Sequence, residues 1–157
     1  MHEQFVKYFS IVLCLVAILS SCEDYVSEFD TRKDEYAVRY NVTYSTVYDF
    51  HNIAHVSYTN FFAGSGSSYG YTGKPTQIEY YIEGTEVYVV ASRVPKGAHV
   101  ELSTYVDVPE ALPNTKVEIT IEVAKGKEYD YTEVAKTTAE CPLKGNPLTI
   151  SYDIPNL

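Results

Sequence analysis

Apolar and polar residues alternate with a period of two along most of the chain after residue 35. Between residues 36 and 44 every second residue is Tyr or Val, and the residues between them are mostly polar. A β-strand directs successive side chains to opposite faces, so this alternation predicts a strand with one buried face. Tyr36, Tyr40 and Tyr44 are therefore predicted core residues, with hydroxyls that reach the edge of the packed sheets.

The same alternation recurs at short, regular intervals. Further predicted strands cover residues 53–62, 77–83, 87–91, 100–106, 116–123, 131–139 and 148–154. Gly84-Thr85, Pro95-Lys96-Gly97 and Lys125-Gly126-Lys127 mark tight turns between them. Seven or eight strands without a convincing helix predict an all-β fold, an immunoglobulin-like β-sandwich of mostly antiparallel strands. The likeness is architectural, since the chain has no Trp, and a small closed barrel is the alternative.

The start of the chain follows a different pattern. Residues 11–19 form an unbroken apolar run behind Lys7. The run is shorter than the roughly 20 residues that span a bilayer, and it is typical of a secretory signal peptide. It ends in Leu19-Ser20-Ser21-Cys22, which resembles a bacterial lipobox. The resemblance implies cleavage before Cys22 and attachment of lipid to its sulfur, so that Cys22 anchors the chain in a membrane. An ordinary signal peptide followed by a chance Cys is the alternative.

The residues after Cys22 are rich in acidic side chains, including Glu23, Asp24, Glu28 and Asp30. This stretch resembles the acidic segment after the lipidated Cys in surface lipoproteins of the Bacteroidetes group. The resemblance implies an outer-membrane lipoprotein on the cell surface, with the periplasmic face as the alternative. We therefore expect a signal peptide over residues 1–21, a lipidated acidic tether over 22–34 and one β-sandwich domain over 35–157.

Composition narrows the possible functions. The chain has 157 residues, 45% of them hydrophobic and 21% charged, which favours one folded domain. Its formal charge of −9 argues against non-specific binding to nucleic acid, which needs clustered Lys and Arg. With Cys14 in the signal peptide and Cys22 lipidated, Cys141 remains alone and no intrachain disulfide is available. We expect Cys141 to be a half-buried small hydrophobe rather than a nucleophile.

Residues that would carry chemistry are sparse. His51 and His55 are four residues apart, a spacing that on a strand separates two side chains by about 13 Å, too far to share one ion. The serines form no Gly-x-Ser-x-Gly elbow, and the Gly/Ser segment lacks the Lys of a phosphate-binding loop. We therefore predict a protein that is not an enzyme, with no catalytic residue, metal or cofactor.

Five tyrosines are the candidate ligand-binding residues. Tyr69 and Tyr71 lie in a Gly/Ser-rich segment, a mixture that suits recognition loops. The alternative is a hairpin tip whose tyrosines fold back onto the sheet. Tyr81, Tyr88 and Tyr105 are predicted on the faces opposite Ile and Val, where together they would form an exposed aromatic stripe. The alternative is that the tether or the last strand covers this stripe.

Three short motifs follow one another in an order that resembles MmpS-like transport accessory proteins. They are Tyr40-Asn41-Val42-Thr43, Val56-Ser57-Tyr58-Thr59-Asn60 and Val117-Glu118-Ile119-Thr120-Ile121. The resemblance implies a small membrane-tethered β-sandwich that partners a large membrane transporter and has no catalytic residues. Here the predicted tether is a lipid anchor, where that family has a membrane helix.

The sequence thus predicts a non-enzymatic, lipid-anchored interaction module of the cell envelope, accessory to an envelope protein assembly or transporter. A carbohydrate-binding surface lipoprotein that uses exposed tyrosines is the alternative. The expected partners are the membrane, through the lipid on Cys22, and either an envelope protein or a glycan, but no nucleic acid.

Overall fold

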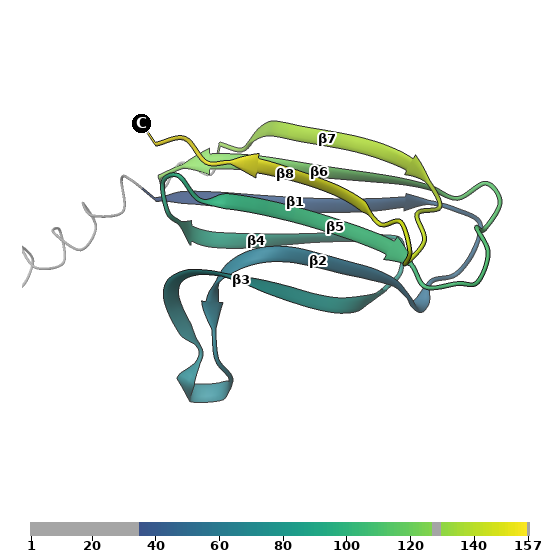
Figure 1. Cartoon of the computed structure of the whole chain (residues 1–157), viewed down its shortest axis with the longest axis horizontal. Coiled ribbons are helices and arrows are strands. Elements are labelled where there is room, and N and C mark those ends of the chain that lie inside the picture. The colour runs from purple at the N-terminus through teal and green to yellow at the C-terminus, as the bar shows by residue number, and fades with distance from the viewer. Residues whose placement is uncertain (1–34, 127–129, 157) are drawn as a thin grey trace, which may run out of the picture. The chain divides into compact units, whose positions relative to one another are not determined.

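The computed structural model describes residues 35–126 and 130–156, which belong to one compact unit, Asp34–Leu157 (Figure 1). Its elements are β1 Tyr36–Ser45, β2 His51–Ala63, the short 3-10 helix η2 Gly66–Ser68, β3 Gly70–Glu83, β4 Glu86–Val94, β5 His99–Val106, β6 Lys116–Lys125, β7 Thr132–Glu140 and β8 Leu148–Asp153. Among these residues, no helix is long and apolar enough to cross a membrane. The predicted signal peptide, lipobox and tether lie outside the described residues.

The strands form two four-stranded antiparallel sheets that pack face to face. Sheet A has the order β4-β1-β6-β7, and sheet B has the order β3-β2-β5-β8. This confirms the predicted all-β sandwich of eight strands, and the two separate sheets exclude the closed barrel. The tight connection at Gly84-Thr85 carries the chain from β3 in sheet B to β4 in sheet A, so it joins the two layers.

The core lies between the sheets and is built from the inward faces of the central strands. Val38, Tyr40 and Val42 of β1 are fully buried, as are Ile119 and Ile121 of β6. The outward residues between them are more exposed, as a period of two requires. The predicted burial of Tyr36, Tyr40 and Tyr44 is confirmed, because all three are less than a tenth exposed.

The hydroxyls of two core tyrosines, Tyr40 and Tyr44, lie elsewhere than predicted. Tyr40 donates to the main-chain oxygen of Thr59 in β2 at 2.8 Å, and the Tyr44 hydroxyl bonds the Thr104 hydroxyl in β5. These two hydroxyls bridge the two sheets, so the prediction that they reach the sandwich edge is wrong for Tyr40 and Tyr44. A Tyr side chain is long enough to cross much of the roughly 10 Å between packed sheets, and the facing strands supply partners there. Burial raises the pKa of Tyr40, and it raises the pKa of Tyr44 to about 12.

Cys141 follows the last residue of β7 and is more deeply buried than predicted. The residue is only 4% exposed, and its backbone has φ 21°. The Cys141 N–H donates to Thr115 at 2.9 Å, and its Sγ accepts the Leu112 N–H at 3.2 Å. Cys141 therefore helps to close one end of the sandwich.

Candidate functional site

The candidate tyrosines occupy three separate places. Tyr69 and Tyr71 lie at the tip of the β2–β3 hairpin, Tyr81 and Tyr105 lie on the outer face of sheet B, and Tyr88 lies on the outer face of sheet A. The expected stripe of Tyr81, Tyr88 and Tyr105 is therefore wrong. Tyr88 belongs to a strand of the other sheet, and the outer faces of a sandwich point in opposite directions.

The β2–β3 hairpin is long, and its end bends away from the packed sheets (Figure 1). The strand register shifts between Asn60 and Phe62, and beyond this irregularity Phe62 pairs with Tyr71. Such a shift bends a strand and increases its twist. At the tip Gly64 has φ 109°, and a Cβ there would lie 2.3 Å from the Ser68 main-chain oxygen. The tight tip therefore requires glycine at this position.

Three rings meet at this end of the hairpin, and we call Phe62, Tyr69 and Tyr71 the aromatic tip. The Phe62 ring lies 6.0 Å from that of Tyr69 in a stacked arrangement and 5.5 Å from that of Tyr71 edge-on. The buried Asn60 donates from Nδ2 to the Tyr69 hydroxyl at 3.2 Å. Tyr69 is thus held in place while 52% of it stays exposed.

Tyr71 is fixed from the other side by β4. The Arg93 guanidinium lies 4.1 Å from the centre of the Tyr71 ring, and Arg93 Nε donates to Glu35 at 3.2 Å. Tyr71 therefore follows the fold-back alternative, whereas Tyr69 remains exposed. Sequence reasoning missed Phe62 and Arg93. Phe62 could have been found, because it is an apolar residue beside the Gly/Ser segment. No local signal links Arg93 to Tyr71, which lies 22 positions away.

On the outer face of sheet B a histidine lies between two tyrosines. His55 pairs in register with Tyr81 on one side and Tyr105 on the other. Its ring stacks on Tyr105 at 4.5 Å and meets Tyr81 edge-on at 5.2 Å. His51, which the sequence predicts to be too far from His55 to share an ion with it, lies 3.1 Å from Asp49. Within residues 35–126 and 130–156, no group of three His, Cys, Asp or Glu side chains is arranged to hold a metal.

Tyr81 also belongs to a small polar cluster with Asp107 and Lys144. Tyr81 donates to Asp107 at 2.8 Å, and Lys144 lies 3.3 Å from the same carboxylate oxygen. The hydrogen bond to Asp107 raises the pKa of Tyr81 to about 12, and the bond from Tyr81 lowers the pKa of Asp107. The polar groups of this cluster thus bond one another, and Tyr81 has a fixed orientation.

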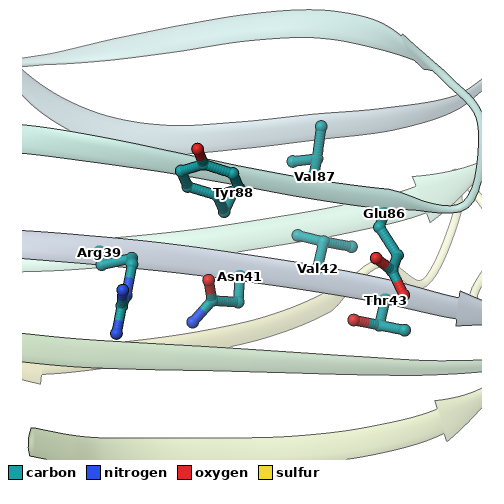
Figure 2. A pocket seen from close by; sticks show the side chains of 7 residues that line it. All are labelled: Arg39, Asn41, Val42, Thr43, Glu86, Val87 and Tyr88. Carbon is teal, nitrogen blue, oxygen red and sulfur yellow. The ribbon is translucent and has the colours of Figure 1, made fainter. Parts of the chain in front are cut away.

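The outer face of sheet A carries a shallow groove of about 340 Å³ beside Tyr88 (Figure 2). Tyr88 is 74% exposed, and Asn41 lies opposite it on the neighbouring strand. Arg39, Thr43 and Glu86 complete the polar part of the lining. The groove therefore combines one exposed aromatic ring with several hydrogen-bonding groups.

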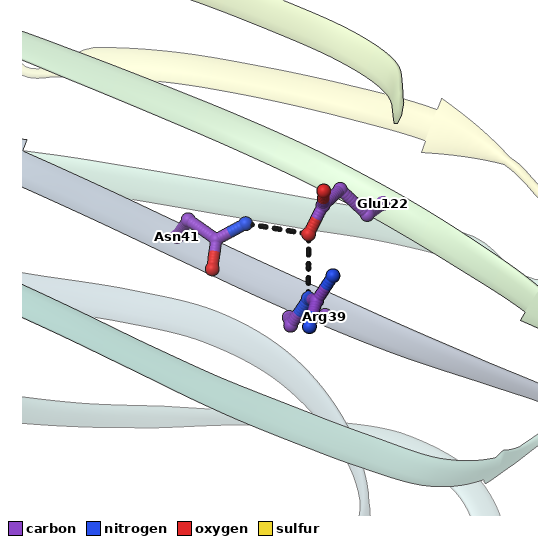
Figure 3. A network of polar contacts seen from close by, with 3 residues as sticks. All are labelled: Arg39, Asn41 and Glu122. Atoms are coloured by element: carbon purple, nitrogen blue, oxygen red, sulfur yellow. Dashed lines mark hydrogen bonds and ion pairs between the residues drawn. The ribbon is translucent and has the colours of Figure 1, made fainter. Parts of the chain in front are cut away.

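Glu122 of β6 orients two of these groups (Figure 3). Its Oε2 accepts from Arg39 Nε at 2.5 Å and from Asn41 Nδ2 at 2.7 Å. Partial burial acts to raise the pKa of Glu122, but the hydrogen bonds from Arg39 and Asn41 outweigh it and hold the pKa below its usual value. The Arg39 guanidinium also lies 4.3 Å from the centre of the Tyr131 ring, so the groove has a preorganised polar side.

Comparisons with known proteins identify no relative of this chain. It matches no protein-family model, no curated protein and no solved structure. The resemblance to MmpS-like proteins and to surface lipoproteins stays a prediction.

Proposed function

We propose that this protein is a non-enzymatic, lipid-anchored interaction module of the bacterial cell envelope, accessory to an envelope protein assembly or transporter. In this proposal the lipid on Cys22 holds the sandwich at the outer membrane, with the domain on the cell surface. The domain binds its protein partner through the aromatic tip. The observation that carries the proposal is the ordered packing of Phe62, Tyr69 and Tyr71 on a hairpin that bends away from the sheets.

The physical reason is preorganisation. Binding energy at protein interfaces is concentrated in a few residues, among which Tyr and Arg are enriched. A Tyr ring already held by its neighbours loses little conformational freedom when a partner packs on it. Tyr69 meets this condition, because Phe62 stacks on its ring and Asn60 bonds its hydroxyl while about half of the residue stays exposed.

The test compares two exposed tyrosines at different places on the domain. Intact cells carrying the wild-type chain, Tyr69→Ala or Tyr88→Ala are treated with a crosslinker, and the proteins recovered with the purified chain are quantified. Because interface hot spots contribute about 2 kcal/mol or more, we expect Tyr69→Ala to lower recovery of the partner by at least about tenfold. Tyr88→Ala, the matched control, should leave recovery unchanged. Equal recovery with all three chains would refute binding through the aromatic tip.

The groove beside Tyr88 favours carbohydrate binding as a second candidate. An exposed aromatic ring can stack on the apolar face of a sugar, while preoriented polar groups such as Asn41 and Arg39 bond its hydroxyls. Electrophoresis in gels containing polysaccharide tests this function with the same two variants. Here Tyr88→Ala should abolish retardation of the wild-type chain and Tyr69→Ala should preserve it. Unchanged migration of the wild-type chain across a panel of polysaccharides would exclude it.

A further inference from the structure

One edge of the sandwich lacks the features that normally prevent strand addition. Each sheet has two edge strands, namely β4 and β7 in sheet A and β3 and β8 in sheet B. Edge strands are commonly protected by charged residues, by proline or by short length. β3 contains Lys74 and Pro75, β7 contains Glu133 and Lys136, and β8 has only six residues. Three of the four edges are therefore protected.

Among the described strands, β4 is the exception over its first six residues, because its second charge, Arg93, and its irregular pairing lie beyond them. From Glu86 to Ala91 it reads Glu-Val-Tyr-Val-Val-Ala, with one charge and neither Pro nor Gly. This segment keeps an unbroken register with β1, and the irregularity in the pairing comes only beyond Ala91. High β-propensity and low charge on a regular edge are typical of a segment that pairs with another strand.

The register identifies which main-chain groups of β4 face the free edge. The Tyr44 N–H donates to the Thr85 oxygen at 2.8 Å. Hydrogen-bonded and non-bonded pairs alternate along an antiparallel ladder. Val87, Val89 and Ala91 are thus the residues that bond β1. It follows that the N–H and C=O groups of Glu86, Tyr88 and Val90 point away from β1, toward the edge.

We propose that this edge pairs with the same edge of a second copy of the chain, antiparallel and about a two-fold axis at Val89. Tyr88 of each copy then lies opposite Val90 of the other, and the two residues exchange main-chain hydrogen bonds. Sheet A of one copy continues into sheet A of the other. This inference is independent of protein binding through the aromatic tip, but it uses the surface of Tyr88, so the dimer and sugar stacking on Tyr88 exclude each other.

The occupant is a second copy because the segment is complementary to itself in this register. Tyr88 is 74% exposed and Val90 is 47% exposed, and both lie on the outer face, so each covers the other across the axis. Aromatic and β-branched residues are favourable cross-strand neighbours. On the inner face Val87 comes opposite Ala91. The single charge, on Glu86, comes opposite the uncharged Ser92, so no like charges meet.

The same symmetry limits the assembly to two copies. A two-fold contact uses the same surface on both partners and leaves no second copy of that surface free. The remaining edges carry Lys, Pro or Glu, or are short, and they do not extend the sheet further. A closed dimer is therefore expected rather than a fibre.

The first experiment tests the register. Two differently tagged full-length chains, purified in detergent, carry Tyr88→Cys and Val90→Cys respectively and are mixed under mild oxidation. The proposed pairing places these residues opposite each other at about 5.5 Å between Cα atoms, within reach of a disulfide. We expect the mixed dimer to exceed either same-variant dimer several-fold. The chain without an introduced Cys reports any contribution of its own three cysteines. Dominant Tyr88→Cys homodimers, or crosslinking no greater than in that control, would overturn the proposal.

The second experiment tests the edge itself by sedimentation velocity over a range of protein concentrations. Val90→Lys places a charge on the outer face of the edge, where 47% of the residue is exposed in one copy. It is expected to raise the dimer dissociation constant at least about tenfold. Val47→Lys, at an exposed residue outside any strand, is the matched control and should dimerise as the wild type does. A monomeric wild-type chain, or dimers equally stable in all three proteins, would overturn the proposal.

Discussion

Replacing Tyr44 with Phe removes one hydroxyl from the middle of the core and leaves the ring in place. Tyr44 is 3% exposed, and its hydroxyl bonds that of Thr104 in the opposite sheet. The Thr104 hydroxyl also donates to the main-chain oxygen of His55 at 2.7 Å. Thr104 therefore keeps a partner in the variant, and no buried group is left without a hydrogen bond. Near neutral pH we expect the free energy of unfolding to fall by about 0.5–1.5 kcal/mol.

The same substitution should have the opposite effect in alkali. Burial raises the pKa of Tyr44 from about 10 to about 12, so the folded state holds the proton more strongly than the unfolded state does. The stability linked to this proton is fully present below pH 10 and is lost as the pH rises toward 12. A rise of the pKa from about 10 to about 12 corresponds to roughly 3 kcal/mol. The Phe variant has no such group, so it should become more stable than the wild type near pH 12.

Urea unfolding followed by circular dichroism, at a series of pH values, measures both effects. Other ionising groups, including Tyr40, are common to the two proteins, so the difference between their unfolding free energies isolates Tyr44. That difference should shrink above about pH 10 and change sign before about pH 12. A difference that stays constant over this range, or that grows in favour of the wild type, would refute the burial of an un-ionised Tyr44 between the sheets.

Two further substitutions probe the hairpin tip and the polar side of the groove. Gly64→Ala places a side chain at a residue with φ 109°, where it would lie against the Ser68 oxygen. We expect this substitution to lower the free energy of unfolding by about 1–3 kcal/mol, measured by thermal unfolding, and to weaken partner capture. An unchanged melting temperature would contradict the tip geometry. Glu122→Gln removes a carboxylate whose pKa lies below its usual value of 4.5. The wild type should lose stability as the pH falls below about 4.5, and the variant should lose less, as measured by acid unfolding; identical acid transitions would contradict the hydrogen bonds from Arg39 and Asn41.

The parts of the fold that depend on local alternation could be predicted from the sequence. The burial of Tyr36, Tyr40 and Tyr44 follows from a period of two within one strand, whatever the strand packs against. The strand count and the sandwich follow from the same signal repeated between turn residues. What alternation does not specify is the sheet that each strand joins. Alternation alone therefore groups Tyr88 with Tyr81 and Tyr105, although the turn at Gly84-Thr85 takes β4 into the other sheet.

The candidate sites depend on contacts between residues far apart in the chain, and those contacts have no local signature. Arg93 packs on Tyr71 only because the fold places Tyr71 of the β2–β3 hairpin beside the end of β4. His55 meets Tyr81 and Tyr105 only because β2 lies between β3 and β5. The exposure of Tyr69 was predictable from its Gly/Ser-rich surroundings, whereas the ring that supports it was not.

The central claim is that the aromatic tip binds an envelope protein, and photocrosslinking in intact cells tests it most directly. A photoreactive amino acid is placed at Ser67, exposed beside the tip, or at Val47, exposed in the loop at the other end of β2. We expect light to link the Ser67 variant to one protein in a fixed ratio, and the Val47 variant to capture little of that protein. No crosslinked protein from Ser67, or the same products from both positions, would contradict it.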